Sequence, residues 1–443
     1  MESFALIVLY LLILIALASF VHKRLLINGF PGAYNGFVLG SILYYVIVPI
    51  ILIIFKSYYL NQAGDWRYNQ LLHFVYGYDV KLSNILFAIG GLIIGMIAFH
   101  FGYALSRKSR NNNIINYLII EENKLIIKKA ALTTFIIGSI AIFIYISAFG
   151  GLKNTLQLSE VLRQHYSSIS DYGLSSVYSY FLILSGALSL APVLLYLNAK
   201  NTQRKGDYFL FYCSLIIAFI YMLINSGKSA FLRLAIVFIY IFMFEKRIKN
   251  KWVYFIIIIA LGLPIMDVLD AVFAQESVVF ALKNFNYLYL VREFSIPTEL
   301  SYNMNAIVER YGYLYFKNLI TDFLDILPGL QFEQSFRNTS EFVRGPNWMN
   351  LGGTPNDVLT YGFLQYRYIG VFVIWLIWGG ICGWLDTLIS RIYDNRGKHV
   401  LAIFVCMNVF SVITCADISS TILYNLSFVI VSYVLWRYSK SIN

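Results

Sequence analysis

The sequence predicts an all-α, polytopic integral membrane protein of about eleven transmembrane helices with one large external helical loop. Composition gives two reasons: 59% of the 443 residues are hydrophobic and only 13% are charged, whereas about a quarter of an ordinary soluble chain is charged. The third reason is that apolar runs of about 18 residues or more recur along the chain, which is the length that a helix needs to cross a bilayer.

Hydropathy places the expected spans, with ends uncertain by several residues. They are residues 4–21, 34–55, 83–104, 130–149, 175–197, 208–225, 229–244, 252–269, 366–387, 400–415 and 421–437. The first run carries its basic cluster, His22-Lys23-Arg24, on its C-terminal side, so it is expected to stay as a helix and not to be cleaved as a signal peptide. One long interval, 266–357, lacks such a run and divides an N-terminal bundle (1–265) from a C-terminal bundle (358–443).

The charge on alternating loops predicts the orientation. Loops on one side of the spans hold 20 Lys and Arg, and the short loops on the other side hold seven. Because cytoplasmic loops collect positive charge, the N-terminus is expected outside, the C-terminus in the cytoplasm, and 266–357 on the outer face. The same rule explains the formal net charge of +11, so we expect no binding to nucleic acid.

Cysteine usage and ligand spacing give no sign of a metal or a disulfide. The four cysteines lie in or beside apolar runs and form no CxxC pair. We therefore expect neither a metal nor another cofactor. The spacings Gly91-x3-Gly95 and Gly379-x3-Gly383 predict helices that approach closely inside the membrane.

The external interval is expected to be mostly helical. Residues 311–327 predict an amphipathic helix that suits a membrane surface or the top of a bundle. A second, more polar helix or an ordered loop is expected over 333–344. Pro355 fits the first turn of the next helix, with Thr354 as its N-cap.

Charged residues near the outer face are the candidates for chemistry. Lys228 and Arg233 open an apolar helix there, and they can hold an anion or anchor the helix to lipid headgroups. Arg292-Glu293 lies among aromatic residues and suits contact with a phosphate or a sugar carboxylate, or a local salt bridge.

Further cations and one histidine lie on the same side. Arg337 and Arg344 belong to the external interval, although ordinary ion pairs with nearby glutamates also explain Arg337. In the loop 150–173, Arg163 precedes His165, which can act as a general base or be simply solvated. A cap rich in cations and aromatic residues suits an amphiphilic anionic substrate presented from the lipid, such as a polyprenyl diphosphate.

Three stretches resemble the Wzy family of bacterial oligosaccharide repeat-unit polymerases, which includes the O-antigen and enterobacterial common antigen polymerases. They are the turn Asn225–Arg233, in which Lys228 takes the place of an arginine; the segment Arg292–Pro297 at the start of the large loop; and Leu351–Asp357, followed by Gly362-Phe363-Leu364 and Gly370. The topology match covers nearly the whole chain.

The resemblance implies transfer of a growing glycan from one undecaprenyl diphosphate to the non-reducing end of a lipid-linked repeat unit. The reaction would take place on the outer face of the bacterial cytoplasmic membrane, by a GT-C-like, inverting, metal-independent glycosyltransferase that uses no nucleotide sugar. Its partners would be lipid-linked oligosaccharides, membrane lipid, a chain-length regulator and a flippase.

Such a reaction needs cations to stabilise the diphosphate leaving group and a base for the acceptor hydroxyl. The candidate bases are Glu293, Asp357 and His165. The residues expected to contact diphosphate or glycan are Lys228, Arg233, Arg292, Arg337, Arg344, Arg163 and Thr354.

Two alternatives remain open. An O-antigen ligase shares the fold type and the lipid donor, and a flippase or transporter acts on the same lipid-linked oligosaccharide. Transporters place charge near the bilayer midplane, whereas the predicted spans are nearly free of charge, which favours an enzyme.

Overall fold

The computed structural model is all-helical over the residues that it describes. These are 2–65, 68–77, 80–107, 118–157, 177–225, 228–248, 268, 286–324, 336–345, 356–392 and 394–440. Seven helices within these ranges are long and apolar enough to span a membrane, namely Glu2–Asn28, Ala33–Ile54, Leu82–Arg107, Leu125–Ala148, Tyr180–Thr202, Lys205–Ile224 and Val358–Ser390. The all-helical, membrane-spanning class is therefore confirmed.

The bundle is built from the long helices and the shorter pieces that continue them. Its elements are α1 (Glu2–Asn28), α2 (Ala33–Ile42), η1 (Leu43–Ile47), α3 (Val48–Ile54), α6 (Leu82–Arg107), α7 (Leu118–Ala148), α9 (Val177–Ser185), η4 (Gly186–Ser189), α10 (Ala191–Thr202), α11 (Lys205–Ile224), α12 (Lys228–Glu245), α21 (Val358–Ser390), α22 (Asn395–Val412), α23 (Ile418–Tyr424) and α24 (Leu426–Lys440).

The seven long apolar helices coincide with seven of the eleven predicted spans. Two further predicted spans, 229–244 and 400–415, are the helices α12 and α22, and 421–437 is divided between α23 and α24. The predicted span 252–269 lies outside the described residues, apart from 268. The number eleven stays a prediction.

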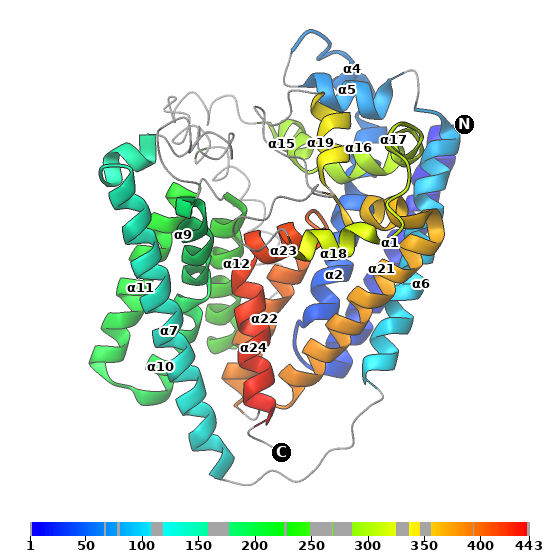
Figure 1. Cartoon of the computed structure of the whole chain (residues 1–443). Helices are drawn as coiled ribbons and strands as arrows, with labels where there is room; N and C mark the ends of the chain where they lie inside the picture. The colour runs from blue at the N-terminus through cyan, green and yellow to red at the C-terminus, as the bar shows by residue number, and fades with distance from the viewer. Residues whose placement is uncertain are drawn as a thin grey trace.

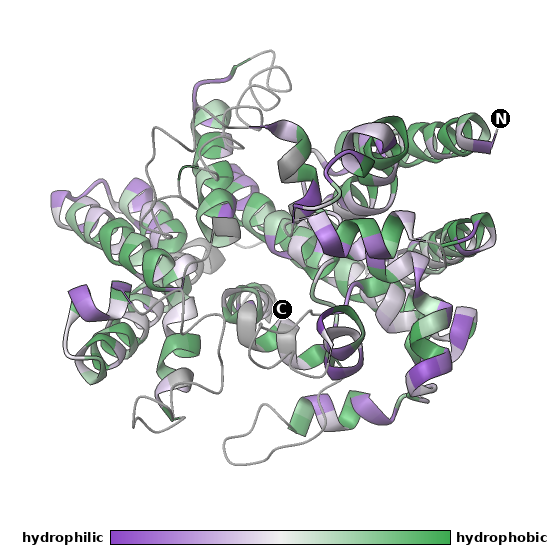
Figure 2. Cartoon of the chain, turned by 90° about the horizontal axis from the view of Figure 1, so that it is seen from above, coloured by the Kyte–Doolittle hydropathy of each residue, from purple (hydrophilic) through white to green (hydrophobic). Residues whose placement is uncertain are grey.

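Large apolar side chains face outward from the bundle. Among them, Phe4 is 73% exposed, Phe143 69% and Phe209 67%. Viewed from above, the peripheral helices are mainly hydrophobic (Figure 2). So much exposed apolar surface is unfavourable in water and is what a lipid-embedded bundle presents.

A group of short helices forms a cap at the end of the bundle where the N-terminus lies, while the C-terminus lies at the opposite end (Figure 1). The cap consists of α4 (Lys56–Leu60), α5 (Asn69–Tyr76), α15 (Tyr287–Glu293), α16 (Ile296–Tyr302), α17 (Met304–Tyr311), α18 (Lys317–Leu324) and α19 (Phe336–Arg344). Hydrogen bonds tie its parts together: Tyr59 Oη donates to Leu288 O at 2.8 Å, and Gln70 Nε2 donates to Glu299 Oε2 at 2.6 Å.

The single amphipathic helix predicted for 311–327 is wrong. The structure has α17 ending at Tyr311 and α18 starting at Lys317. Between them, Gly312, Tyr315 and Phe316 have positive φ angles of 78°, 48° and 62°, which a right-handed helix cannot contain. The second predicted helix, over 333–344, matches α19.

Glycines let α6 and α21 pack backbone against backbone. A Cβ at Gly102 would collide with the carbonyl oxygen of Leu376, and a Cβ at Gly379 with that of Phe99. The predicted close approach is thus confirmed at Gly379, whose partner helix is α6.

One turn of π-helix, η1, interrupts the second span between α2 and α3. It buries two consecutive tyrosines, Tyr44 and Tyr45. The carbonyl oxygen of Tyr44 accepts a hydrogen bond from Thr298 Oγ1 of α16 at 3.0 Å, which fixes the cap on the bundle.

A break divides α21 into a buried helix, 358–365, and a longer helix, 368–390. Tyr366 has φ −169° and ψ 70°, and Arg367 has φ 48° and ψ −139°. The conformation of Arg367 suits glycine and costs another residue about 1–3 kcal/mol. Gly362 and Gly370 pack directly against each other across the break.

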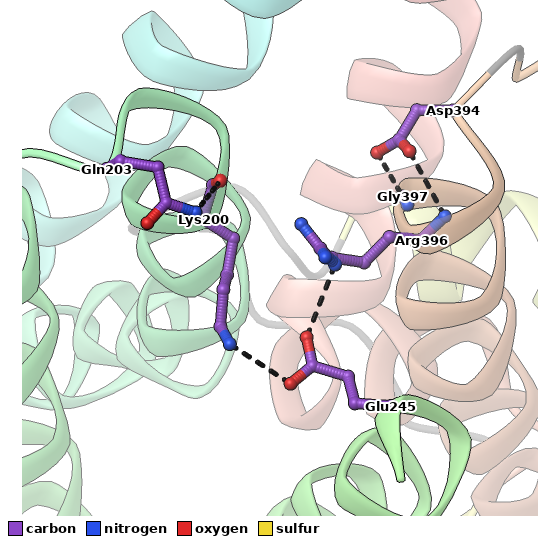
Figure 3. A network of polar contacts seen from close by, with 6 residues as sticks. All are labelled: Lys200, Gln203, Glu245, Asp394, Arg396 and Gly397. Carbon is purple, nitrogen blue, oxygen red and sulfur yellow. Dashed lines mark hydrogen bonds and ion pairs between the residues drawn. The ribbon is translucent and has the colours of Figure 1, made fainter. Parts of the chain in front are cut away.

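Ion pairs join three helices at the end opposite the cap (Figure 3). Glu245 pairs with Lys200 at 3.0 Å and with Arg396 at 3.2 Å, beside a surface cavity of about 840 Å³. Partial burial acts to raise the pKa of Glu245, but hydrogen bonds from Tyr196 and Lys200 and the two positive charges outweigh it, so the pKa is lowered.

The α6–α21 contact leads to a stability prediction. Gly102→Leu should lower the thermal unfolding temperature of the detergent-solubilised protein, because overpacking costs about 1–3 kcal/mol and backbone cannot move aside easily. Gly206→Leu is the matched control, since Gly206 is exposed and a Cβ there meets no atom within 4 Å. Equal unfolding temperatures for the two variants would contradict this packing.

Candidate functional site

The start of α21 is buried and is capped by Asp357. Its Oδ1 accepts hydrogen bonds from the backbone N–H groups of Leu359 and Thr360, both at 3.0 Å. These are two of the N–H groups that a helix leaves without a partner in its first turn. The prediction that Thr354 is the N-cap is therefore wrong, because Asp357 holds that role; Thr354 itself lies outside the described residues.

Tyr45 of η1 fixes the same carboxylate from the opposite helix. Its Oη donates to Asp357 Oδ1 at 2.5 Å, and both side chains are buried. The other oxygen, Oδ2, has no hydrogen-bond partner among the described residues. Asp357 precedes the spanning segment of α21, and burial raises its pKa to about 6, although the hydrogen bonds it accepts act in the opposite direction.

A second carboxylate lies next to this one. Asp417 Oδ1 accepts a hydrogen bond from the backbone N–H of Asn356 at 3.1 Å, and the backbone N–H of Ala416 donates to Asn356 O at 2.8 Å. Asp417 and Asn356 are both completely buried. The connection between α22 and α23 thus packs directly against the residue that precedes Asp357.

A third carboxylate reaches the start of α21 from α18. Asp322 Oδ2 accepts hydrogen bonds at 3.3 Å from Tyr361 Oη and from Asn318 Nδ2. Asn318 and Asp322 are buried, whereas Ile320 is 69% and Phe323 59% exposed. The helix therefore turns its polar face into the protein and its apolar face outward.

Together these side chains form what we call the polar layer: Tyr45, Asn318, Asp322, Asn356, Asp357, Tyr361, Gln365 and Asp417. Several of its buried polar atoms have no partner among the described residues, namely Asn318 Oδ1, Asn356 Nδ2, Asn356 Oδ1, Asp357 Oδ2 and Gln365 Nε2. Each such atom costs about 1–3 kcal/mol. Buried polar groups normally have partners, so this concentration marks a place for a ligand or water.

Arg233 lies beside the polar layer and not on the outer surface where it was expected. It is partly buried in α12, where its Nη1 donates to Ser411 Oγ at 2.9 Å and to Asn425 Oδ1 at 2.8 Å. Ser411 is in the last turn of α22 and Asn425 directly follows α23, so Arg233 contacts the ends of both helices. The spans are therefore less free of charge than the sequence predicted.

The other predicted cations lie in the cap. Arg292 is in the last turn of α15, and Arg337 and Arg344 are seven residues apart on α19. Each of the three takes part in interactions within the protein. The structure thus places Arg233 beside the polar layer that contains Asp357, and it places these three arginines in the cap above the bundle.

Four further predicted residues are described only in part or not at all. Lys228 begins α12 and Glu293 ends α15, but their side chains are not among the described ones. Arg163 and His165 lie outside the described residues. The roles assigned to these four stay predictions.

Sequence reasoning missed most of the polar layer. Tyr45 occurs in an apolar run, and Asp322 lies within the predicted amphipathic helix, where it looks like one more solvated carboxylate. The one available signal for Asp322 is its spacing from Asn318, since side chains four residues apart share a helix face. Nothing in the local sequence marks Tyr45 or Asp417.

The cap of α21 gives a second stability prediction. Asp357→Ala should destabilise the protein by about 1 kcal/mol for the lost N-cap and by about 1–3 kcal/mol more for the buried Tyr45 hydroxyl left without its acceptor. Asp357→Asn should be close to wild type, because its amide oxygen can accept the same bonds. Thermal unfolding in detergent measures both, and an alanine variant as stable as the asparagine variant would rule out the capping role.

The polar layer can accept a proton at Asp357 and can exchange hydrogen bonds with a ligand through both donors and acceptors. Arg233 supplies positive charge beside it. No family model, no curated protein and no solved structure matches this chain. The geometry of the polar layer and the resemblance in short motifs are therefore the basis for a function.

Proposed function

We propose that the protein is a polymerase that joins undecaprenyl-diphosphate-linked oligosaccharide repeat units into a surface polysaccharide on the outer face of the bacterial cytoplasmic membrane. The observation that carries this proposal is the set of unpartnered donors and acceptors in the polar layer. A sugar hydroxyl both donates and accepts hydrogen bonds, so a glycan can satisfy atoms such as Asn356 Nδ2 and Asp357 Oδ2 together.

In the proposed reaction, the acceptor hydroxyl oxygen attacks the anomeric carbon of the donor glycan from the face opposite the diphosphate. The new glycosidic bond forms as the bond from that carbon to the diphosphate oxygen breaks, and the diphosphate takes the electron pair. Asp357 Oδ2 takes the proton of the hydroxyl. A single displacement of this kind inverts the anomeric centre.

Arg233 is the proposed partner of the leaving group. Charge builds up on the diphosphate in the transition state, and a cation fixed in a protein interior stabilises it without reorganisation. Ser411 and Asn425 accept hydrogen bonds from the guanidinium and fix its position. Arg292, Arg337 and Arg344 would contact the glycan or the diphosphate from the cap.

Access to the polar layer requires an element of the cap to move, because Asn356 and Asp357 are buried. The proposed element is α18, which is only eight residues long. Its apolar outer face suits lipid and its polar inner face covers the layer. Outward movement of α18 would admit the head of a lipid-linked glycan from the membrane side.

A second candidate function is transport of the lipid-linked oligosaccharide. The position of Arg233 favours it, since a charged residue inside a membrane bundle is typical of a transport pathway. An O-antigen ligase would use the same donor and differ only in its acceptor. Deletion of the gene distinguishes the polymerase, the transporter and the ligase by the glycans that accumulate.

Deletion of the gene should leave single repeat units on their final surface anchor if the protein is the polymerase. A ligase predicts polymer retained on the lipid carrier, and a flippase predicts repeat units trapped in the cytoplasm. Electrophoresis and mass analysis of surface and lipid-linked glycans distinguish these outcomes. A deletion strain that keeps long chains would contradict the polymerase proposal.

Asp357→Asn should reduce chain growth by a factor of about 10²–10⁴, the usual contribution of a general base. In the wild type, the rate should rise as the pH passes through about 6 and then level off, because only the carboxylate form of Asp357 accepts a proton. Chain elongation is measured in proteoliposomes across this pH range. Glu309→Gln, an exposed change on α17, is the control; an asparagine variant with wild-type rate excludes Asp357 as the base.

A further inference from the structure

Arginine occupies a backbone position that favours glycine. Arg367, in the break of α21, has φ 48° and ψ −139°, a conformation that glycine adopts without a steric penalty and other residues rarely adopt. The surrounding chain enforces it: the backbone N–H groups of Leu314 and Tyr315 donate to Leu364 O at 2.9 Å and to Gln365 O at 3.0 Å. An arginine kept where glycine fits better points to a use for its side chain.

The guanidinium is held outward by tyrosine. Its Nε donates to Tyr313 Oη at 2.5 Å, and its carbon lies 5.9 Å from the centre of the same ring. The rings of Tyr313, Tyr315 and Tyr366 lie within 5.8 Å of one another. Arg367 is exposed, and its remaining N–H donors have no partner among the described residues.

Exposed apolar side chains follow Arg367 along α21. Ile369 and Phe372, in the next turn of α21, are 59% and 39% exposed. Tyrosines next to the end of an apolar span are typical of the boundary between lipid and water. Arg367 therefore combines an exposed positive charge with tyrosines and exposed apolar side chains of α21, which is the arrangement expected at the level of lipid headgroups.

We propose that Arg367 and Tyr313 form a binding site for the phosphate of a membrane lipid, whose hydrocarbon chain lies along Ile369 and Phe372. The charge and the fork of the guanidinium fit a phosphate, which it can bind with two parallel hydrogen bonds. The lipid is either a bulk phospholipid or a polyprenyl phosphate. This site is separate from the polar layer and does not depend on the proposed polymerase activity.

Binding to the purified, delipidated full-length protein tests the site. Native mass spectrometry measures the affinity for phosphatidylglycerol, undecaprenyl phosphate, inorganic phosphate and diacylglycerol. Arg367→Gln should weaken binding of at least one of the two lipid phosphates by about tenfold or more, since a hydrogen bond to a charged group contributes that much. Arg310→Gln is the matched control, because Arg310 is also exposed and lies 5.2 Å from the centre of the Tyr311 ring.

The variant Arg367→Gly distinguishes a loss of lipid binding from a loss of protein stability. It should lose lipid affinity as Arg367→Gln does, while its thermal unfolding temperature stays equal to or above that of the wild type, because glycine relieves the backbone. A preference for phosphatidylglycerol supports the site as one for bulk phospholipid, and a preference for undecaprenyl phosphate supports a carrier-lipid site.

Three results would overturn the proposal. They are an unchanged affinity for both lipid phosphates in Arg367→Gln, equal binding of diacylglycerol, and inorganic phosphate binding as tightly as either lipid. A lower unfolding temperature for Arg367→Gly would contradict the claim that the backbone conformation at position 367 favours glycine.

Discussion

The hydrogen bonds accepted by Asp357 link the two halves of the chain at the start of α21. A helix that starts in a buried part of a protein must find acceptors for its first backbone N–H groups, because a buried N–H group without a partner is costly. One carboxylate oxygen meets that need for α21 and also receives the hydroxyl of Tyr45. The N-terminal helices and the C-terminal bundle are joined at this point.

The same carboxylate has a structural role and, in the proposed reaction, also a chemical one. Its Oδ1 accepts hydrogen bonds from the first turn of α21 and from Tyr45, and those bonds favour the charged form. Burial favours the neutral form more strongly, so the pKa rises to about 6. In the proposed reaction this balance leaves Oδ2 ionised at neutral pH and still able to take a proton, which a well-solvated aspartate does poorly.

Local sequence was enough to predict the helical class and the positions of most spans, because the length of an apolar run is a property of neighbouring residues. It was also enough to select Asp357 and Arg233 as functional candidates. Sequence could not predict how they are used. Hydropathy predicts a span that starts at residue 366, whereas the helix that Asp357 caps starts at residue 358. The difference is the buried piece 358–365, which precedes the break at Arg367.

The parts of the site that were missed depend on contacts between distant residues. Tyr45 and Asp357 are 312 residues apart in the chain, and Asp322 of α18 meets Tyr361 of α21, which is 39 residues further along the chain. The inverted polarity of α18 follows from its position: its inner face meets buried polar groups, so polar residues point inward. Periodicity correctly found an amphipathic segment but could not tell which face is buried.

The π-helical turn η1 has a consequence for how this chain can change over evolution. A π-turn holds one more residue than an α-turn of the same shape, so removing any single residue from 43–47 would restore a regular helix. The helices on both sides would keep their orientation, but the turn would lose the extra residue that places the Tyr45 hydroxyl against Asp357 at the start of α21. Insertions and deletions should therefore be far less tolerated in this one turn than substitutions among its apolar side chains.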